Sequence, residues 1–257
     1  MSKKALAIVS FGTSYPEARR AIETLEQSLQ AAMPGYDFYR AFTSGMIIRK
    51  IEREEGIRIP NPEELMRQLA QAGYEEVVCQ SLHVIPGLEF EKMCMQIQNA
   101  SGNMRVMIGD PMLTSQEDYL LTCQALLSFM PNLQPHEAIV YMGHGTEHAV
   151  NAAYSQVENT FRFLDAERIY VGTVEGFPAL DYVQKRLKVH HVSTVWLAPF
   201  MIVAGDHARN DLAGDDTDSW KSQLTAEGYE VKVLLRGLGD IPGIGDIFVK
   251  HCLDAAK

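Results

Sequence analysis

Two stretches of this chain decide its fold: AIVSFGTS at residues 7–14 and AIVYMGHG at residues 138–145. Each is an apolar run that closes in glycine and small polar residues, as a buried strand does where it enters a loop. A second pair, FYRAFTSG at 38–45 and IYVGTVEG at 169–176, keeps the same offset of 131 residues (138 − 7 and 169 − 38). A strand, its connection and the next strand therefore occur twice, which indicates two similar halves.

Apolar runs of strand length recur along both halves. They lie at residues 5–11, 38–42, 76–82, 104–108, 138–142, 168–174, 193–202 and 230–235. Most lack strict alternation, and segments long enough for a helix separate them, a pattern typical of parallel sheets covered on both faces. We therefore predict an α/β fold of two Rossmann-like half-domains, 1–130 and 131–257, with a cleft between them. Each half would hold a parallel sheet of about four strands flanked by helices.

The composition excludes several classes of protein. With 46% hydrophobic residues the chain can bury a substantial core, and a net charge of −10 argues against a nucleic-acid partner. The four cysteines contain no CxxC pair, so we expect reduced thiols and no structural zinc site. The first apolar run ends at Gly12, too short for a signal peptide or a membrane span, which indicates a cytoplasmic protein without a membrane partner. The oligomeric state stays open, a homo-oligomer included.

Ligands of open α/β sheets bind beyond the carboxyl ends of the strands. A third match, VVCQSLHVIPGLE at 77–89 with VWLAPFMIVAGDH at 195–207, completes the set of strand ends. The residues that follow the matched strands are Thr13, Ser44 and Glu89 in the first half and His144, Glu175 and His207 in the second. Two imidazoles and a carboxylate suit divalent cobalt, nickel, iron or zinc. The second half is therefore predicted to carry a metal site.

Each of these three residues also has a purely structural interpretation. His144 lies in GHG and could be incidental to a tight turn, whereas Glu175 could serve the helix that begins near Pro178. His207 is flanked by Asp206 and Asp211, which either orient its ring or are solvated loop charges.

Other candidates rank lower. His83 ends the third strand and His148 follows His144 by four residues, so either could border the same site or serve a local structural role. The run RAFTSGMIIRK at 40–50 and Arg53 bring positive charge to a strand end. Its cations Arg40, Arg49, Lys50 and Arg53 could bind carboxylates of an anionic ligand or could form a solvated helix face.

Several longer motifs resemble one family. They are SFGTS at 10–14, RAFTSGMIIRK at 40–50, QSLHVIPGLEFEK at 80–92, MGHG at 142–145, VGTVEGFP at 171–178 and PFMIVAGDHARNDLAGDDTDSWK at 199–221. Together they are similar to the anaerobic sirohydrochlorin cobaltochelatases, the CbiK-type class II chelatases. The resemblance implies a ferrochelatase-like fold and a lyase that inserts Co²⁺ into sirohydrochlorin in cobalamin biosynthesis. It also implies that His144, Glu175 and His207 are the metal ligands and catalytic residues, with His144 the leading proton acceptor.

Three alternatives remain at this point. The ligand set does not select cobalt over iron or nickel, so a sirohydrochlorin ferrochelatase or a nickel chelatase fits the same residues. A non-catalytic protein that carries a metal or a tetrapyrrole is a second alternative. A metal-dependent hydrolase is the weakest, because the chain has neither HExxH nor GxSxG.

Overall fold

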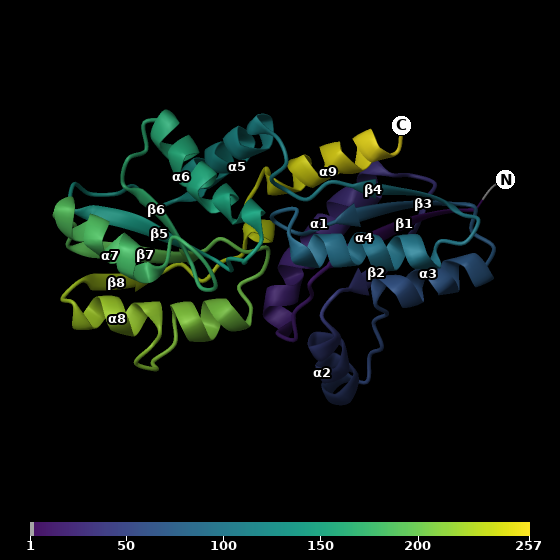
Figure 1. The fold of residues 1–257 in the computed structure, drawn as a ribbon, viewed down its shortest axis with the longest axis horizontal. Helices are drawn as coiled ribbons and strands as arrows, with labels where there is room; N and C mark the ends of the chain where they lie inside the picture. The colour runs from purple at the N-terminus through teal and green to yellow at the C-terminus, as the bar shows by residue number, and fades with distance from the viewer. Residues whose placement is uncertain (1–2) are drawn as a thin grey trace. The chain divides into compact units, whose positions relative to one another are not determined.

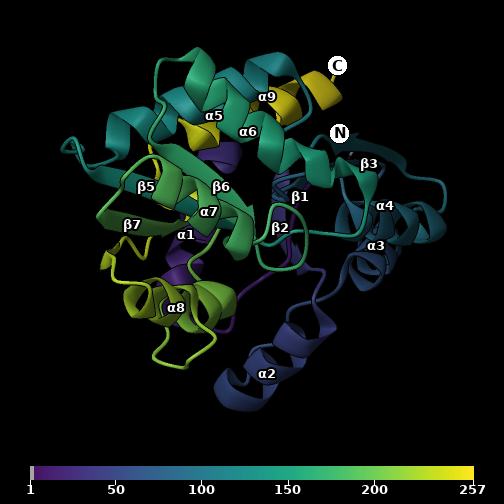
Figure 2. The ribbon, with the colours of Figure 1, turned by 60° about the vertical axis from the view of Figure 1, so that its left-hand side comes forward.

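The computed structural model describes residues 3–257, in which strands and helices alternate almost throughout. Their contacts divide the chain into two units (Figures 1 and 2). Unit 1 comprises Met1–Asp118 and Gly243–Lys257, and unit 2 comprises Tyr119–Pro242. Within the described range, no helix has both the length and the apolar composition that crossing a membrane requires.

Unit 1 is a four-stranded parallel sheet with helices on both faces (Figure 1). Its strands are β1 (Lys4–Ser10), β2 (Asp37–Phe42), β3 (Glu76–Ser81) and β4 (Arg105–Gly109), in the order β2-β1-β3-β4. Its helices are α1 (Pro16–Ala32), α2 (Gly45–Glu55), α3 (Pro62–Gln71), α4 (Leu88–Ala100) and α9 (Ile244–Ala255). Alternate residues of β1 pack against α3 and α4 in one apolar cluster, while α1 and α9 pack together on the other face.

Unit 2 repeats this plan (Figure 2). Its strands are β5 (Glu137–Gly143), β6 (Ile169–Thr173), β7 (Thr194–Pro199) and β8 (Glu230–Val233), in the order β6-β5-β7-β8. Its helices and turns are α5 (Gln116–Phe129, which begins in unit 1), η1 (Ala149–Asn151), α6 (Ala152–Phe163), α7 (Leu180–Val189), η2 (Ala208–Leu212), α8 (Trp220–Ala226) and η3 (Leu238–Asp240). Helices α7 and α8 cover one face through Val183, Leu187 and Trp220. Helices α5 and α6 lie on the other.

The predicted α/β fold is confirmed: residues 3–257 contain eight parallel strands, each overlapping one of the predicted runs. One predicted strand, 193–202, is too long, because β7 ends at Pro199. A proline has no N–H to donate to a ladder, so it suits a strand end. The apolar residues beyond it are buried in a loop instead, where Phe200 packs edge-on against Tyr141.

The predicted division into residues 1–130 and 131–257 does not coincide with the two units. The first boundary falls after Asp118, since most of α5 packs in unit 2, where the Cys123 thiol faces the Val157 carbonyl at 3.6 Å. The last helix, α9, returns to unit 1. There His251 Nε2 lies 3.0 Å from the buried Asp118 carboxylate. The counterpart of α9 in the first half is α5, which follows β4 as α9 follows β8, and the repeat does not say which unit either helix joins.

Candidate functional site

The carboxyl ends of β5, β6 and β7 are neighbours in unit 2. Gly143 of β5 pairs with Thr173 of β6, and Met142 pairs with Pro199 of β7. His144 follows β5 directly and is 43% exposed in its side chain. The β5 end is crowded, because a Cβ on Gly143 would lie 2.2 Å from the Tyr154 ring of α6. His144 therefore follows a closely packed strand end and lies in a more open loop.

Glu175 is drawn beside His144 by the backbone. The N–H of Val174 donates to the Gly143 carbonyl at 3.1 Å, and the N–H of Glu175 donates to the His144 carbonyl at 2.7 Å. These bonds continue the pairing of the two strands into their loops. The Glu175 carboxylate, 61% exposed, lies 3.8 Å from Nδ1 of His144.

Two glycines permit the close approach of these loops. Gly145 has a φ of +87°, and a Cβ there would lie 2.7 Å from the backbone carbon of Glu175. A Cβ on Gly176 would lie 2.8 Å from Oδ1 of Asn151. That amide fastens the loops together, since it accepts from the Thr146 N–H at 3.0 Å and donates to the Phe177 carbonyl at 2.5 Å. A side chain at Gly145 would therefore push against the backbone of Glu175, and one at Gly176 would displace the Asn151 amide.

His207 reaches the same place from the loop after β7. Its ring centre lies 4.6 Å from that of His144, with the two rings perpendicular. Its Nδ1 is 2.5 Å from Oδ2 of Asp211. The loop after β7 is held near its start by η3, because the Leu238 N–H donates to the Met201 carbonyl at 2.8 Å.

The structure therefore brings all three predicted site residues together. Within residues 3–257, however, no three His, Cys, Asp or Glu side chains stand in an arrangement that could hold a metal ion. The Glu175 carboxylate faces Nδ1 of His144, and that nitrogen also lies 3.0 Å from the Gly145 carbonyl. With Nδ1 of each histidine beside an acceptor, Nε2 is the nitrogen left on each ring for a ligand.

The lower-ranked histidines have local partners. His148 begins η1, where its Nδ1 accepts from the Val150 N–H at 3.1 Å. His83 belongs to unit 1, and its Nδ1 lies 2.8 Å from the Ser81 hydroxyl. Burial lowers the pKa of His83 to about 4, and its Nε2 is buried without a hydrogen-bond partner. His148 thus has a structural role, whereas His83 keeps an unsatisfied polar atom.

The predicted basic run is only partly available to a ligand. The Arg40 Nε donates to the buried Glu26 carboxylate at 2.6 Å, and Arg53 pairs with Glu54 at 2.7 Å. The Lys50 ammonium lies 5.3 Å from the centre of the Tyr15 ring. Arg49 is exposed on α2. Arg40 and Arg53 are therefore poorer candidates for an anionic ligand than Arg49 and Lys50.

Two functional-site residues were not predicted. Asn151 joins the His144 and Glu175 loops, and the hydroxyl of Tyr154 accepts from the Gly145 N–H at 3.4 Å. Burial raises the pKa of the Tyr154 phenol. The one sequence signal is their spacing of three residues where α6 begins, which places both side chains on one side of a helix.

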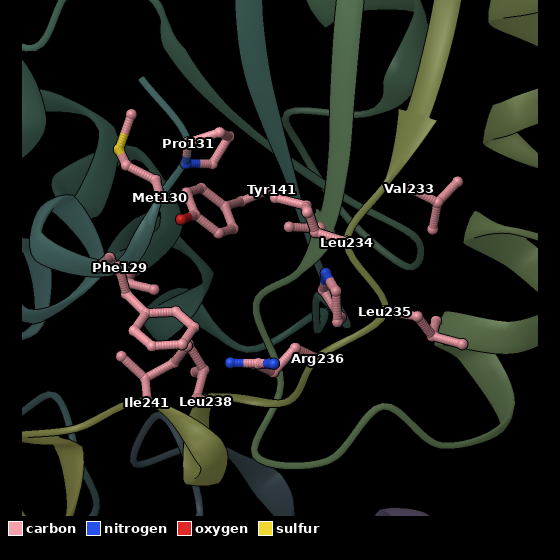
Figure 3. A pocket seen from close by; sticks show the side chains of 13 residues that line it. Phe129, Met130, Pro131, Tyr141, Val233, Leu234, Leu235, Arg236, Leu238 and Ile241 are labelled. Atoms are coloured by element: carbon pink, nitrogen blue, oxygen red, sulfur yellow. The ribbon is translucent and has the colours of Figure 1, made fainter. Parts of the chain in front are cut away.

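Unit 2 also holds a cavity of about 350 Å³ (Figure 3). Figure 3 shows Tyr141, Met130 and Pro131 on one side of it and Arg236 and Leu238 on another. The Arg236 guanidinium lies over the ring of Phe129, 4.7 Å from its centre. None of His144, Glu175 and His207 lines this cavity, which is therefore distinct from the strand-end group.

A family model described as cobalt chelatase (CbiK) matches residues 4–257. The chain is 44% identical to a sirohydrochlorin cobaltochelatase of Salmonella typhimurium, over 97% of this chain and 95% of the relative. It is 30% identical to the sirohydrochlorin cobaltochelatase CbiKC of Nitratidesulfovibrio vulgaris, over 100% of this chain and 92% of that protein.

Two solved structures share the fold. SirB from Bacillus subtilis with Fe³⁺ superposes with a TM-score of 0.66 at 12% identity, covering 99% of this chain and 96% of SirB. CbiX, described as the terminal enzyme of sirohaem biosynthesis in denitrifying bacteria, superposes with a TM-score of 0.56 at 16% identity, covering 98% of this chain and 99% of CbiX. At these identities the likeness bears on the fold alone.

Proposed function

The chain belongs to the cobalt chelatase (CbiK) family, and on that premise we propose that it inserts Co²⁺ into sirohydrochlorin. In this proposal His144, Glu175 and His207 take up the ion and accept protons from the macrocycle. The cytoplasmic location expected from the sequence, without nucleic-acid or membrane partners, is part of the same proposal.

One observation carries the assignment of the site. Two imidazoles from different strand ends lie perpendicular at 4.6 Å, and each turns Nδ1 toward an acceptor so that Nε2 is left for a metal. The carboxylate of Glu175 lies 3.8 Å from Nδ1 of His144. With side chains 43%, 61% and 34% exposed, His144, Glu175 and His207 have room to rotate around one ion.

The chemistry of the reaction needs groups of this kind. Insertion of Co²⁺ releases two pyrrole protons from the ring, and the ion must exchange its protein ligands for ring nitrogens. Neutral imidazoles and a carboxylate can both bind a divalent ion and accept protons once it leaves them. His144 is the leading proton acceptor in this proposal, with Glu175 and His207 as the other ligands.

The choice of metal rests on the family and not on the donors. Two imidazoles and one carboxylate accept Co²⁺, Fe²⁺ and Ni²⁺ alike. The family model and both relatives are named for cobalt, which favours Co²⁺ as the substrate ion. Sirohydrochlorin carries several carboxylates, and Arg49 and Lys50 of α2 are the candidates to bind them.

The test is an anaerobic absorbance assay with sirohydrochlorin and Co²⁺, Fe²⁺ or Ni²⁺ in turn. We expect many turnovers with Co²⁺ that are lost in the double variant His144→Ala, His207→Ala. The matched control is His136→Ala, His191→Ala, which removes two exposed histidines of the same unit and should keep full turnover. A spectral change limited to one equivalent of protein would instead favour the carrier protein. Faster turnover with Fe²⁺ or Ni²⁺ would replace cobalt as the substrate.

A further inference from the structure

The turn that follows His207 carries a carboxylate directed at that histidine. Oδ2 of Asp211, in the π-helical turn η2, lies 2.5 Å from Nδ1 of His207, the residue immediately before that turn. The geometry points to Asp211 as a positioning residue: it fixes the orientation and tautomer of His207 so that Nε2 is presented to the metal. This inference rests on the proposed function, because it deepens the role of one predicted ligand.

The turn is a firm base for this contact. Ala208 and Leu212, at its two ends, are fully buried. The Arg209 N–H donates to the Gly205 carbonyl and the Gly214 N–H to the Asn210 carbonyl, both at 3.1 Å. The backbone of Asp211 is therefore held in place, while its side chain remains 43% exposed. Because the backbone of Asp211 is fixed, its side chain can hold the His207 ring in one orientation at a small cost in entropy.

The chemistry of the pair defines the tautomer. An ionised carboxylate only accepts hydrogen bonds, so the 2.5 Å contact with Asp211 favours the tautomer of His207 that carries its hydrogen on Nδ1. A neutral imidazole has one donor nitrogen and one acceptor nitrogen, which leaves the lone pair on Nε2. Carboxylates behind metal-binding histidines recur in proteins for this reason, and their loss typically lowers metal affinity or activity by about 10–100-fold.

The two histidines differ in how they are held. Nδ1 of His144 faces the carbonyl of its own neighbour, Gly145, at 3.0 Å, and no side-chain substitution removes that acceptor. Nδ1 of His207 depends on the side chain of Asp211. The orientation of His207 can therefore be changed by a substitution that leaves both histidines in place.

The experiment is a Co²⁺ titration of the metal-free full-length protein without sirohydrochlorin, followed by the visible absorption of bound cobalt. For Asp211→Ala we expect about 10–100-fold weaker binding and an altered cobalt spectrum. Asp211→Asn should lie between Asp211→Ala and the unchanged protein, since its amide oxygen still accepts. In turnover, KM for Co²⁺ should rise while KM for sirohydrochlorin stays unchanged.

The controls separate this inference from the proposed function. Asp215→Ala removes a nearby carboxylate that pairs with Lys221 and is 98% exposed, so it should bind cobalt normally. If His207→Ala loses cobalt but both Asp211 variants bind it normally, the positioning role is wrong and the proposed site stands. If His207→Ala itself binds cobalt and turns over normally, the proposed site is wrong. Circular dichroism checks the folding of each variant, and Asp211→Asn decides the question should Asp211→Ala not fold.

Discussion

The carboxyl ends of the two sheets follow one topology but differ in what their side chains do. In unit 1 two of these three side chains support the local backbone, and the third forms an exposed ion pair. Ser44 caps α2 by accepting from the Ile47 N–H at 3.4 Å, and Thr13 accepts from the Tyr15 N–H at 3.2 Å. Glu89 lies in the first turn of α4 and pairs with Lys92 at 3.5 Å.

In unit 2 the corresponding side chains interact with one another. His144 lies against both Glu175 and His207, and each of the three is at least one-third exposed. The backbone around them is held by other residues, notably Asn151 and Tyr154. One βαβ frame can therefore hold either capping residues or a group of potential ligands at its strand ends, because the strands form the frame and the loops form the site.

The largest effect expected is on turnover. His144→Ala should lower metal insertion by about 10²–10⁴-fold, because it removes a ligand that also accepts a proton. The fold should persist, since this side chain is 43% exposed. The absorbance assay measures turnover, and circular dichroism checks folding. Thr13→Ala, at the matching strand end of unit 1, should stay close to the unchanged protein. Near-normal turnover in the His144 variant would mean that the strand ends of unit 2 do not form the catalytic site.

A second contrast concerns the buried acids of the helices that follow the first strand of each unit. Glu158 of α6 pairs with Arg186 and accepts from the Val171 N–H at 2.9 Å, whereas Glu26 of α1 pairs with Arg40. Replacing either glutamate by alanine should lower the free energy of unfolding by about 1.5–3 kcal/mol, since a partly buried arginine loses a charge-assisted hydrogen bond. Glu158→Ala should cost about 1–3 kcal/mol more, because a strand N–H also loses its acceptor.

Urea denaturation of the two variants measures this difference. Equal losses of unfolding free energy in the two variants would mean that the hydrogen bond from the Val171 N–H to Glu158 adds no stability.

In unit 2 the loops that carry His144 and Glu175 approach each other closely at Gly145. Gly145→Ala should destabilise the protein by about 1–3 kcal/mol through its positive φ and should also lower turnover, since the new Cβ would push against Glu175. Gly228→Ala is the control. Its φ is +92° with nothing within 4 Å of the added Cβ, so it reports the backbone cost alone. Thermal unfolding and the turnover assay together make the test. Equal turnover in both variants would contradict the importance of the Gly145 contact.

The smallest effect expected is a pH dependence in unit 1. Burial lowers the pKa of His83 from 6.5 to about 4, so between these values the unfolded chain binds a proton that the folded chain does not. Stability should therefore fall as the pH drops from 6.5 toward 4. The third matched pair of strands has an offset of 118 residues (207 − 89), so the residue of unit 2 that corresponds to His83 is Met201.

His83→Met introduces that residue and should flatten the profile. Urea midpoints at pH 7 and pH 5 measure it, and an unchanged slope in the variant would assign the pH dependence to other groups.

Much of this structure could be predicted from local sequence. The eight strands were found because each is an apolar run bounded by turn residues, and the duplication of the parallel sheet followed from the repeat. The site residues His144, Glu175 and His207 were found because they occupy matching strand ends. Their convergence then required only that parallel strands end at one edge.

Other features depended on packing between distant segments. The return of α9 to unit 1 rests on its contacts with α1 and on the His251–Asp118 pair, neither of which has a periodic signal. The role of Asn151 rests on two loops that meet only in the folded chain. The end of β7 at Pro199 was missed because the buried loop after it is as apolar as a strand.

By itself the sequence determined the α/β class, the duplicated parallel sheets and the three strand-end residues, since apolar periodicity and repeat spacing are local properties of the chain. Only the tertiary structure decided the boundaries of the two units, the 4.6 Å approach of the two imidazoles and the partner of His207. These depend on distances between loops, and such distances follow from how the strands and glycines pack rather than from any single stretch of residues.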